Sequence, residues 1–176
     1  MIERPRERPI VASSMHPELA GALRFEHLVQ VNDRDDPRVT PMARAQLWRG
    51  LVMRARFPAS FVPWLDECTI ERDGEDLLRT LRFGQQIVRD RVHFDDDTAV
   101  EYTIVDAAEG SSFRMSMRIE QPTRDGLFVR FTYESWSPDH QDGDSHVGAI
   151  REAYRLADID TIFRIRQLAQ SGLLDD

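Results

Sequence analysis

Hydrophobic and polar positions alternate with a period of two residues along much of this chain, which is the pattern of half-buried β-strands. The first alternating run, residues 23–31, places Phe25 and His27 in phase with Val29. The alternation returns near residue 65 and continues to residue 136, interrupted by turn signals such as Asp125-Gly126. We therefore predict six further strands in an antiparallel meander, at residues 66–72, 76–83, 86–94, 99–107, 112–120 and 127–136.

Two segments follow the period of an α-helix instead. Thr40 as N-cap and Pro41 at the first helical position predict a helix over residues 41–56, which Pro58 ends. A short helical turn can follow at residues 58–63. The second pattern predicts a long helix from about residue 145 to 171, capped by Gly172. At 1.5 Å per residue this helix is about 40 Å long and can cross a whole sheet.

This order of elements predicts an α+β fold, in which a twisted seven-stranded antiparallel sheet wraps around the long C-terminal helix. One or two short helices follow the first strand. Residues 1–22 lack periodicity and predict an arm that is mobile or packed on the surface. We expect a single domain over residues 23–172, followed by a C-terminal tail at 173–176.

Composition and charge narrow the classes of function. The chain is 41% hydrophobic and contains no apolar run long enough for a membrane span, so we expect no membrane insertion. A net charge of −8 argues against nucleic acid as a partner. All 23 basic residues are arginine, which excludes lysine chemistry. The first residues lack the apolar core of a secretory signal, so we expect a cytoplasmic protein, and the lone Cys68 fits that compartment.

Several motifs, in order, resemble those of a known family: "FEHLVQVND", "QLWRGLVMRARFP", "LRFG", "FTYE" and "ADIDTIFRIRQLAQSG". They are similar to the AtaL-like branch, a family of unknown function within the START and birch-pollen-allergen-like (SRPBCC) superfamily. The resemblance extends from Leu23 to Gly172. It implies a helix-grip fold with a cavity between the sheet and the last helix. The superfamily includes lipid carriers, hormone receptors, polyketide cyclases and ring-hydroxylating oxygenase domains, and the branch supplies no catalytic residues.

The inward faces of the predicted strands and helix supply candidate cavity residues, which are large, soft and aromatic. These candidates are Phe25, Phe113, Met115, Met117, Phe131 and Tyr133 from the strands, and Tyr154 and Ile162 from the long helix. The alternative is that they fill a solid core.

Four polar residues share these apolar faces. His27, Arg79 and Tyr102 each alternate in phase with hydrophobic neighbours, and Asp158 lies inside the apolar arc of the long helix. A buried guanidinium or carboxylate needs a partner. Asp158 therefore pairs with an arginine of its own helix, Arg151 or Arg155, or with Arg79 or a ligand across the cavity.

The arginine-rich helix at 41–56 has a continuous apolar arc, formed by Ala45, Leu47, Trp48, Leu51, Val52 and Ala55. This arc predicts a helix docked on the domain, with Arg49, Arg54 and Arg56 in solvent or at a rim. Met53, Phe57, Phe61 and Trp64 lie beyond the arc, and we predict that they form the mouth of the cavity.

Two other features concern metal binding and association. The acidic segment 139–146 contains two histidines, but its spacing matches no zinc or calcium motif, so we expect neither metal nor cofactor. A second apolar stripe on the long helix, Leu156, Ile159 and Phe163, needs a cover from the N-terminal arm or from a second copy in a homodimer.

Three functions remain open from the sequence. The first is binding of a hydrophobic or aromatic small molecule in the internal cavity. The second is a polyketide cyclase or aromatase-like enzyme that uses acid–base residues of the cavity. The third is a non-catalytic protein-interaction module. An apolar cavity with one anchoring charge favours the first, two titratable groups facing each other favour the second, and a solid core favours the third.

Overall fold

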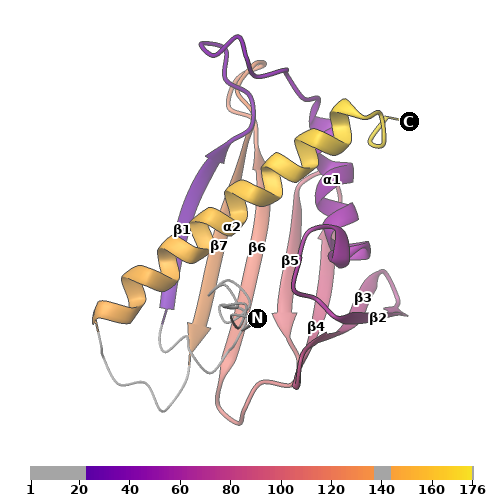
Figure 1. Cartoon of the computed structure of the whole chain (residues 1–176), viewed down its shortest axis with the longest axis vertical. Coiled ribbons are helices and arrows are strands. Elements are labelled where there is room, and N and C mark those ends of the chain that lie inside the picture. The colour runs from indigo at the N-terminus through magenta and orange to yellow at the C-terminus, as the bar shows by residue number, and fades with distance from the viewer. Residues whose placement is uncertain (1–22, 137–143, 176) are drawn as a thin grey trace, which may run out of the picture.

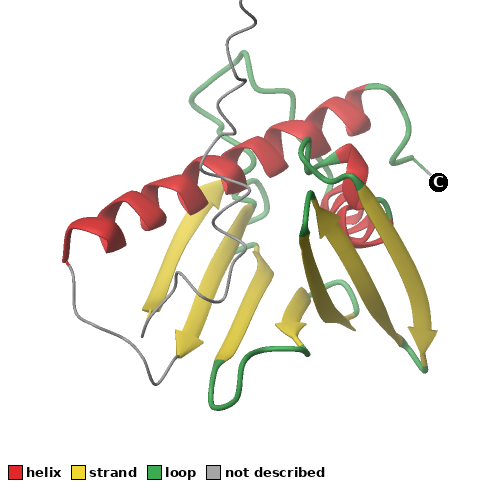
Figure 2. Ribbon diagram, turned by 60° about the horizontal axis from the view of Figure 1, so that its bottom comes forward, coloured by secondary structure: helices red, strands yellow, loops and turns green. Residues whose placement is uncertain are grey.

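The computed structural model describes residues 23–136 and 144–175, and within these ranges it contains one antiparallel sheet and two helices on the same face of it (Figures 1 and 2). The elements follow the predicted order. They are β1 (Leu23–Gln30), α1 (Arg44–Arg56), the 3₁₀ turn η3 (Pro58–Ser60), β2 (Glu67–Asp73), β3 (Asp76–Phe83), β4 (Gln86–Asp95), β5 (Ala99–Ile104), β6 (Ser112–Glu120), β7 (Phe128–Trp136) and α2 (Asp144–Gln170).

The seven strands of the described chain lie in the order β1-β7-β6-β5-β4-β3-β2. Strands β2 to β7 form the predicted meander, and β1 pairs with β7, so that the first and last strands are neighbours. Helix α2 runs diagonally across β1, β7 and β6, and its C-terminal half approaches α1 (Figure 1). The predicted seven-stranded sheet with a long C-terminal helix is confirmed.

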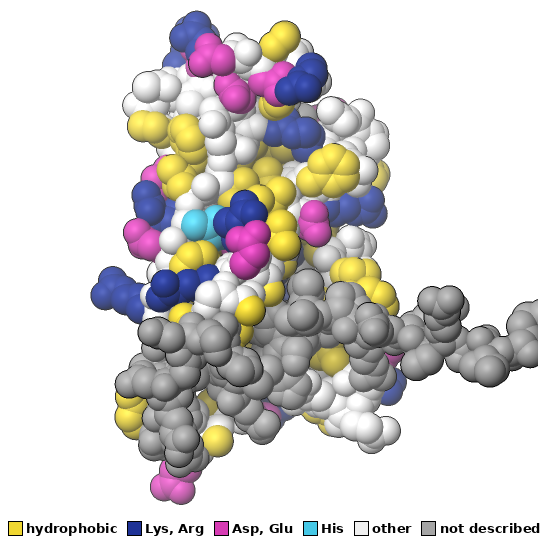
Figure 3. Space-filling model, turned by 60° about the vertical axis from the view of Figure 1, so that its left-hand side comes forward, with side chains coloured by type: hydrophobic (Ala, Val, Ile, Leu, Met, Phe, Trp, Pro, Cys, Tyr) yellow, Lys and Arg dark blue, Asp and Glu magenta, His cyan; other side chains and the backbone are white. Residues whose placement is uncertain are grey.

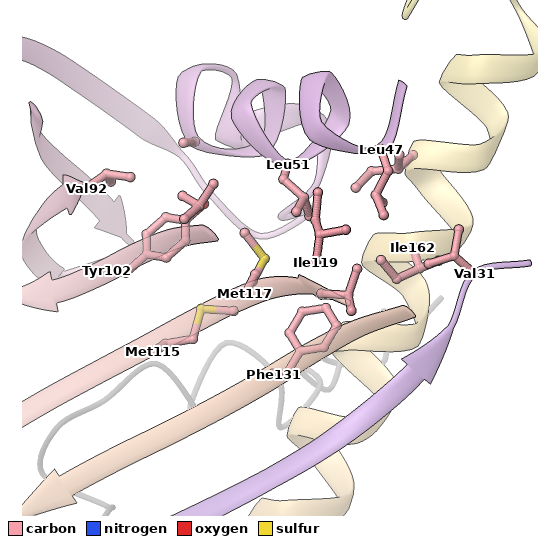
Figure 4. Packing of buried hydrophobic residues seen from close by; sticks show 14 of the residues in the cluster. Val31, Leu47, Leu51, Val92, Tyr102, Met115, Met117, Ile119, Phe131 and Ile162 are labelled. Atoms are coloured by element: carbon pink, nitrogen blue, oxygen red, sulfur yellow. The ribbon is translucent and has the colours of Figure 1, made fainter. Parts of the chain in front are cut away.

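Alternating residues of the central strands bury one face of the sheet against the helices. Phe113, Met115, Met117 and Ile119 of β6 are buried, whereas Arg114 and Arg118 between them are exposed. Figure 4 shows Leu47 and Leu51 of α1 pointing toward Met117 and Ile119 of β6. Burial of such apolar area is the main stabilising contribution to a fold of this kind. The faces predicted from the alternation are confirmed.

The predicted start of the first helix was wrong. The helix begins at Arg44 after the N-cap Ala43, whose N–H donates to Gln46 Oε1 at 2.9 Å. The preceding residues stay extended because Met42 is bound to Asn32, two residues after β1. The Met42 N–H donates to Asn32 Oδ1, and Asn32 Nδ2 donates to the Met42 carbonyl. Thr40 therefore caps nothing. Strand β5 also ends three residues earlier than predicted, at Ile104.

The end of α2 matches the prediction. Gly172 has φ of 77°, a conformation that suits glycine, and Leu173 N–H donates to the Leu168 carbonyl to close the helix. The following Leu174 is only 1% exposed and lies in the core, and its carbonyl accepts a hydrogen bond from Arg49 Nε at 2.6 Å. The last described residues therefore pack against α1. None of the described helices has the length and apolarity needed to cross a membrane.

Candidate functional site

Residues 57–66 connect α1 to β2, and we call them the link. A pocket lies between the sheet, α2, α1 and the link, and we call it the central pocket. Helix α2 provides its roof, strands β4 to β7 provide its floor, and the link closes one side. Aromatic side chains dominate its walls. The lining residues are Arg54, Phe61, Val62, Pro63, Trp64, Asp90, Tyr102, Ile104, Phe113, Met115, Tyr133, Tyr154, Ala157, Asp158 and Thr161.

The structure brings together about half of the residues proposed from the sequence. The proposed residues that line the central pocket are Phe61, Tyr102, Phe113, Met115, Tyr133, Tyr154 and Asp158, and Trp64 lies beside them. They come from the link, from three strands and from α2. Alternation placed the strand residues on the right face, and helical periodicity did the same for Tyr154 and Asp158.

Other proposed residues lie elsewhere. Met117, Phe131 and Ile162 are buried in the solid part of the core, with exposed fractions of 0%, 0% and 4%. Met53 and Phe57 do not form the mouth of the central pocket. They line a separate open groove of about 720 Å³ between α1, the end of β4 and the C-terminal residues.

Asp158 is the centre of a buried hydrogen-bonded cluster. The Tyr133 hydroxyl of β7 donates to Asp158 Oδ1 at 2.6 Å, and His27 Nε2 of β1 lies in hydrogen-bond contact with Oδ2 at 2.7 Å. Asp158 is 1% exposed. The pairings with Arg79, Arg151 or Arg155 that the sequence left open are not formed, and Tyr133 and His27 are the partners instead. His27 and Phe25 lie beside the pocket, with their rings stacked 5.5 Å apart.

The electrostatics of this cluster follow from its burial. Burial raises the pKa of Asp158, although the hydrogen bonds from His27 and Tyr133 and the charge of Arg54 act in the opposite direction. Burial and the neighbouring Asp158 carboxylate raise the pKa of Tyr133 well above its ordinary value, so Tyr133 remains a hydrogen-bond donor. Burial also raises the pKa of Tyr154, whose ring stacks on that of Tyr133 at 4.1 Å.

Arg79 finds its partner on the next strand. Its Nε and Nη2 donate to the two oxygens of Asp90 at 2.8 and 2.6 Å, and its Nη1 donates to the Ala55 carbonyl of α1. Arg79 and Asp90 are 2% and 1% exposed. This ion pair joins β3, β4 and the end of α1. Arg79 lies behind Tyr102, with its guanidinium carbon 4.9 Å from the ring centroid.

Arg54 faces the central pocket, although the sequence placed it in solvent or at a rim. Its Nε is buried and has no hydrogen-bond partner among the described residues, and the same is true of the Tyr102 hydroxyl. The Arg54 guanidinium carbon lies 5.3 Å from the Tyr102 ring centroid. Two buried polar groups of one pocket are thus left without a partner in the part of the chain that the structure describes.

The sequence did contain signals for the residues that were missed. Gly50 packs against Ile165 of α2, so it belongs to the buried face of α1. On a helical wheel Arg54 falls between Gly50 and Leu47, which places it toward the core rather than off the arc. Ala45, by contrast, is exposed. Asp90 alternates in phase with the buried Val88 and Val92, as Arg79 does with its own neighbours.

No group of three or more histidine, cysteine, aspartate or glutamate side chains that could hold a metal ion occurs within the described ranges. The histidine-containing segment 139–146 lies outside the residues whose side chains the structure describes.

A family model described as "AtaL: Acetylaranotin biosynthesis cluster protein L" matches residues 29–172, which is more than half of the chain. The chain belongs to the AtaL family. The motifs that resembled this family in the sequence lie within or next to the matched range. A search of curated proteins finds no match.

Solved structures confirm the fold of this AtaL-family chain. Ara h 8.0201 is similar with a TM-score of 0.58 and 14% identity, over 86% of this chain and 99% of the other. The di-domain ARO/CYC StfQ from the steffimycin biosynthetic pathway has a TM-score of 0.64 and 10% identity, over 88% of this chain and 53% of its own. The ZhuI aromatase/cyclase from Streptomyces sp. R1128 has a TM-score of 0.51 and 13% identity, over 86% and 95%. Like these structures, the chain has a helix-grip fold, in which a seven-stranded antiparallel sheet is crossed by a long C-terminal helix.

Proposed function

We propose that this protein binds a small hydrophobic or aromatic molecule in the central pocket. The observation that carries the proposal is the composition of the pocket wall, in which aromatic rings from the link, the sheet and α2 surround a few polar groups. Pockets that bind small organic molecules have this character: apolar walls provide affinity, and a small number of polar groups orient the ligand. A solid core would have favoured the protein-interaction module instead.

The size of the pocket limits the ligand and suggests how it enters. The free volume is about 90 Å³. A cavity of about 150 Å³ is known to hold benzene, so even a one-ring ligand requires a wall to move outward. The link is the wall best able to move, because its backbone is held mainly by its own short-range hydrogen bonds, such as Phe61 N–H to the Pro58 carbonyl. Phe61 and Trp64 would move with it.

The similar proteins support a small-molecule role. Two of the structures are an aromatase/cyclase and a di-domain ARO/CYC, and the latter comes from the steffimycin biosynthetic pathway. The description of the family refers to acetylaranotin biosynthesis. These likenesses are too distant in sequence to transfer a reaction.

An enzyme of the cyclase or aromatase kind is the second candidate, and one observation favours it. Asp158, with its raised pKa, lies in the pocket wall together with Tyr133. Perturbed acids often mark catalytic sites. However, protein groups already engage both oxygens of Asp158 and both oxygens of Asp90. Arg54 is the charged pocket residue whose buried nitrogen lacks a partner among the described residues. One anchoring charge in an apolar pocket favours binding over catalysis.

Filling the pocket tests the proposal. Native mass spectrometry of the purified protein should detect a co-purified small molecule, and ligand-detected NMR should identify one-ring aromatic compounds that bind.

Ala157→Phe places a ring in the pocket, so we expect binding to fall at least about tenfold, as overfilling a packed site predicts. Ala149→Phe, on the exposed face of the same helix, is the matched control and should bind normally. Equal binding by both variants would contradict the proposed site.

A further inference from the structure

The central pocket contains two buried polar groups that form no hydrogen bond with the described residues. Arg54 Nε and the Tyr102 hydroxyl are both buried, and neither has a hydrogen-bond partner in the described residues. Tyr102 as a whole is 5% exposed. A buried polar group without a partner destabilises the folded state, and native proteins keep few of them. Two in one pocket therefore indicate that something other than the protein satisfies them.

Both carboxylates of the pocket are hydrogen-bonded to other protein groups instead. Asp158 accepts from Tyr133 at 2.6 Å and contacts His27 at 2.7 Å. Asp90 accepts from two nitrogens of Arg79. Tyr102 also lies close to two guanidinium groups, at 5.3 Å from Arg54 and 4.9 Å from Arg79. Arg79 is paired with Asp90, whereas Arg54 forms no salt bridge among the described residues, although its charge acts on Asp158.

We propose that the ligand is an aromatic or hydrophobic molecule with an acidic oxygen, either a carboxylate or an ionised phenol or enol, which Arg54 binds and to which the Tyr102 hydroxyl donates a second hydrogen bond. The inference rests on the proposed function of the pocket. Its chemistry is specific, because arginine and a hydroxyl are both donors and an oxyanion accepts from both. The apolar part of the ligand would lie against the rings of Phe113, Tyr154 and Trp64.

The charge of Arg54 acts on the centre of the pocket. It is one of the influences that lower the pKa values of Asp158 and Tyr133, against the larger effect of burial. An anion bound at Arg54 would offset that charge. Arg56, two residues further along α1, is exposed and lies over Phe94 instead. The same helix therefore offers an arginine in the pocket and a matched arginine outside it.

Benzoate and benzamide test the inference, because they have nearly the same size and shape and differ in charge. Their affinities are measured by chemical-shift titration of the ¹⁵N-labelled full-length chain. A charge-assisted hydrogen bond contributes about 1.5–3 kcal/mol, so we expect benzoate to bind about 10- to 100-fold more tightly than benzamide. Arg54→Gln should abolish this preference while benzamide still binds, and Arg56→Gln should keep it. Tyr102→Phe should weaken benzoate binding several-fold.

The outcomes separate the inference from the proposed function. Equal affinity of the wild-type chain for the two compounds, or a preference that survives in Arg54→Gln, would overturn the oxyanion site. Benzamide binding that is lost in Ala157→Phe would at the same time uphold the pocket as a binding site. Failure of both compounds to bind the wild-type chain would contradict the proposed function, and the oxyanion site with it.

Discussion

Tyr133 and Tyr102 line the same pocket, but their hydroxyl groups have opposite situations. The Tyr133 hydroxyl donates to the buried Asp158, and the Tyr102 hydroxyl has no partner among the described residues. Tyr133→Phe should therefore lower the free energy of unfolding by about 1–3 kcal/mol, because one oxygen of a buried carboxylate loses its donor. Tyr102→Phe removes nothing that is bonded, so it should leave stability unchanged or slightly higher. Urea denaturation measures both, and equal losses in the two variants would contradict this difference.

The exposed pair of His93 and Asp76 predicts a measurable dependence on pH. His93 Nδ1 lies 2.7 Å from Asp76 Oδ1, and this hydrogen bond raises the pKa of His93 above 6.5 and lowers that of Asp76 below 3.8. The stability that His93 contributes is thus fully present below pH 6.5 and is lost as the pH rises through its raised folded pKa. The contribution of Asp76 is present above pH 3.8 and is lost as the pH falls through its lowered pKa.

An NMR titration of the His93 imidazole checks this pair directly. Asp76→Asn should return the pKa of His93 toward about 6.5, the value of a free imidazole, since its main charged acceptor is gone. Asp96→Asn, in the exposed turn after β4, is the control and should leave it raised. The shift should also shrink in high salt, because the pair is exposed and ions screen it. A pKa that Asp76→Asn leaves unchanged would count against the hydrogen bond.

At the scale of the elements, the sequence predicted the strands and helices well because each depends on local periodicity. The inward faces of β6 and β7 followed from alternation alone. The partners of Asp158 did not, because His27 and Tyr133 reach it only when β1 pairs with β7 and α2 crosses both strands. Periodicity says which face a residue occupies but not which neighbour lies opposite. The pairing of Arg79 with Asp90 could have been predicted, because both residues interrupt apolar faces of adjacent strands.

The contact between α1 and α2 depends on a glycine. A Cβ added at Gly50 would overlap the side chain of Ile165, so only glycine allows the helices to approach this closely. Gly50→Ala should therefore destabilise the protein by about 1–3 kcal/mol, which is the usual cost of overfilling a packed core. Gly148 of α2 has open space around the same position, and Gly148→Ala should stabilise by up to about 1 kcal/mol through helix propensity.

Thermal unfolding of the two glycine variants distinguishes packing from propensity. If both alanines stabilised the protein, the close approach at Gly50 would be wrong. Ile165→Val in the Gly50→Ala background should recover part of the loss, because the shorter side chain makes room for the new methyl group.

For the whole molecule, the order of the strands explains why the sequence could predict a pocket but not all the residues that line it. Pairing of β1 with β7 lets one strand from each end of the chain share the surface beneath α2, while α1 and the link close the other side. The link residues Phe61 and Trp64 lie at the pocket as expected, but Met53 and Phe57 turn to the groove on the far side of α1. The predicted arc of α1 left out Gly50, which packs against Ile165 of α2 and which no hydrophobic pattern counts.

The apolar stripe on the outer side of α2 predicts how whole molecules associate. Leu156, Ile159 and Phe163 are 49%, 39% and 59% exposed within the described structure. The side of the molecule with β1 and α2 shows apolar side chains between charged ones (Figure 3). A stripe of this kind is self-complementary in an antiparallel pairing of two α2 helices, so we expect a homodimer.

Sedimentation of the full-length chain tests this association. Phe163→Glu places a charge within the apolar stripe and should raise the dimer dissociation constant at least about tenfold. Ile87→Glu changes an equally exposed residue on β4, far along the sheet from α2, and should leave the association unchanged. A wild-type chain that sediments as a monomer at every concentration would contradict the dimer and would leave residues 1–22 as the expected cover for the stripe. In that case Phe163→Glu would change neither the mass nor the affinity of the central pocket for benzamide, because the stripe faces away from it.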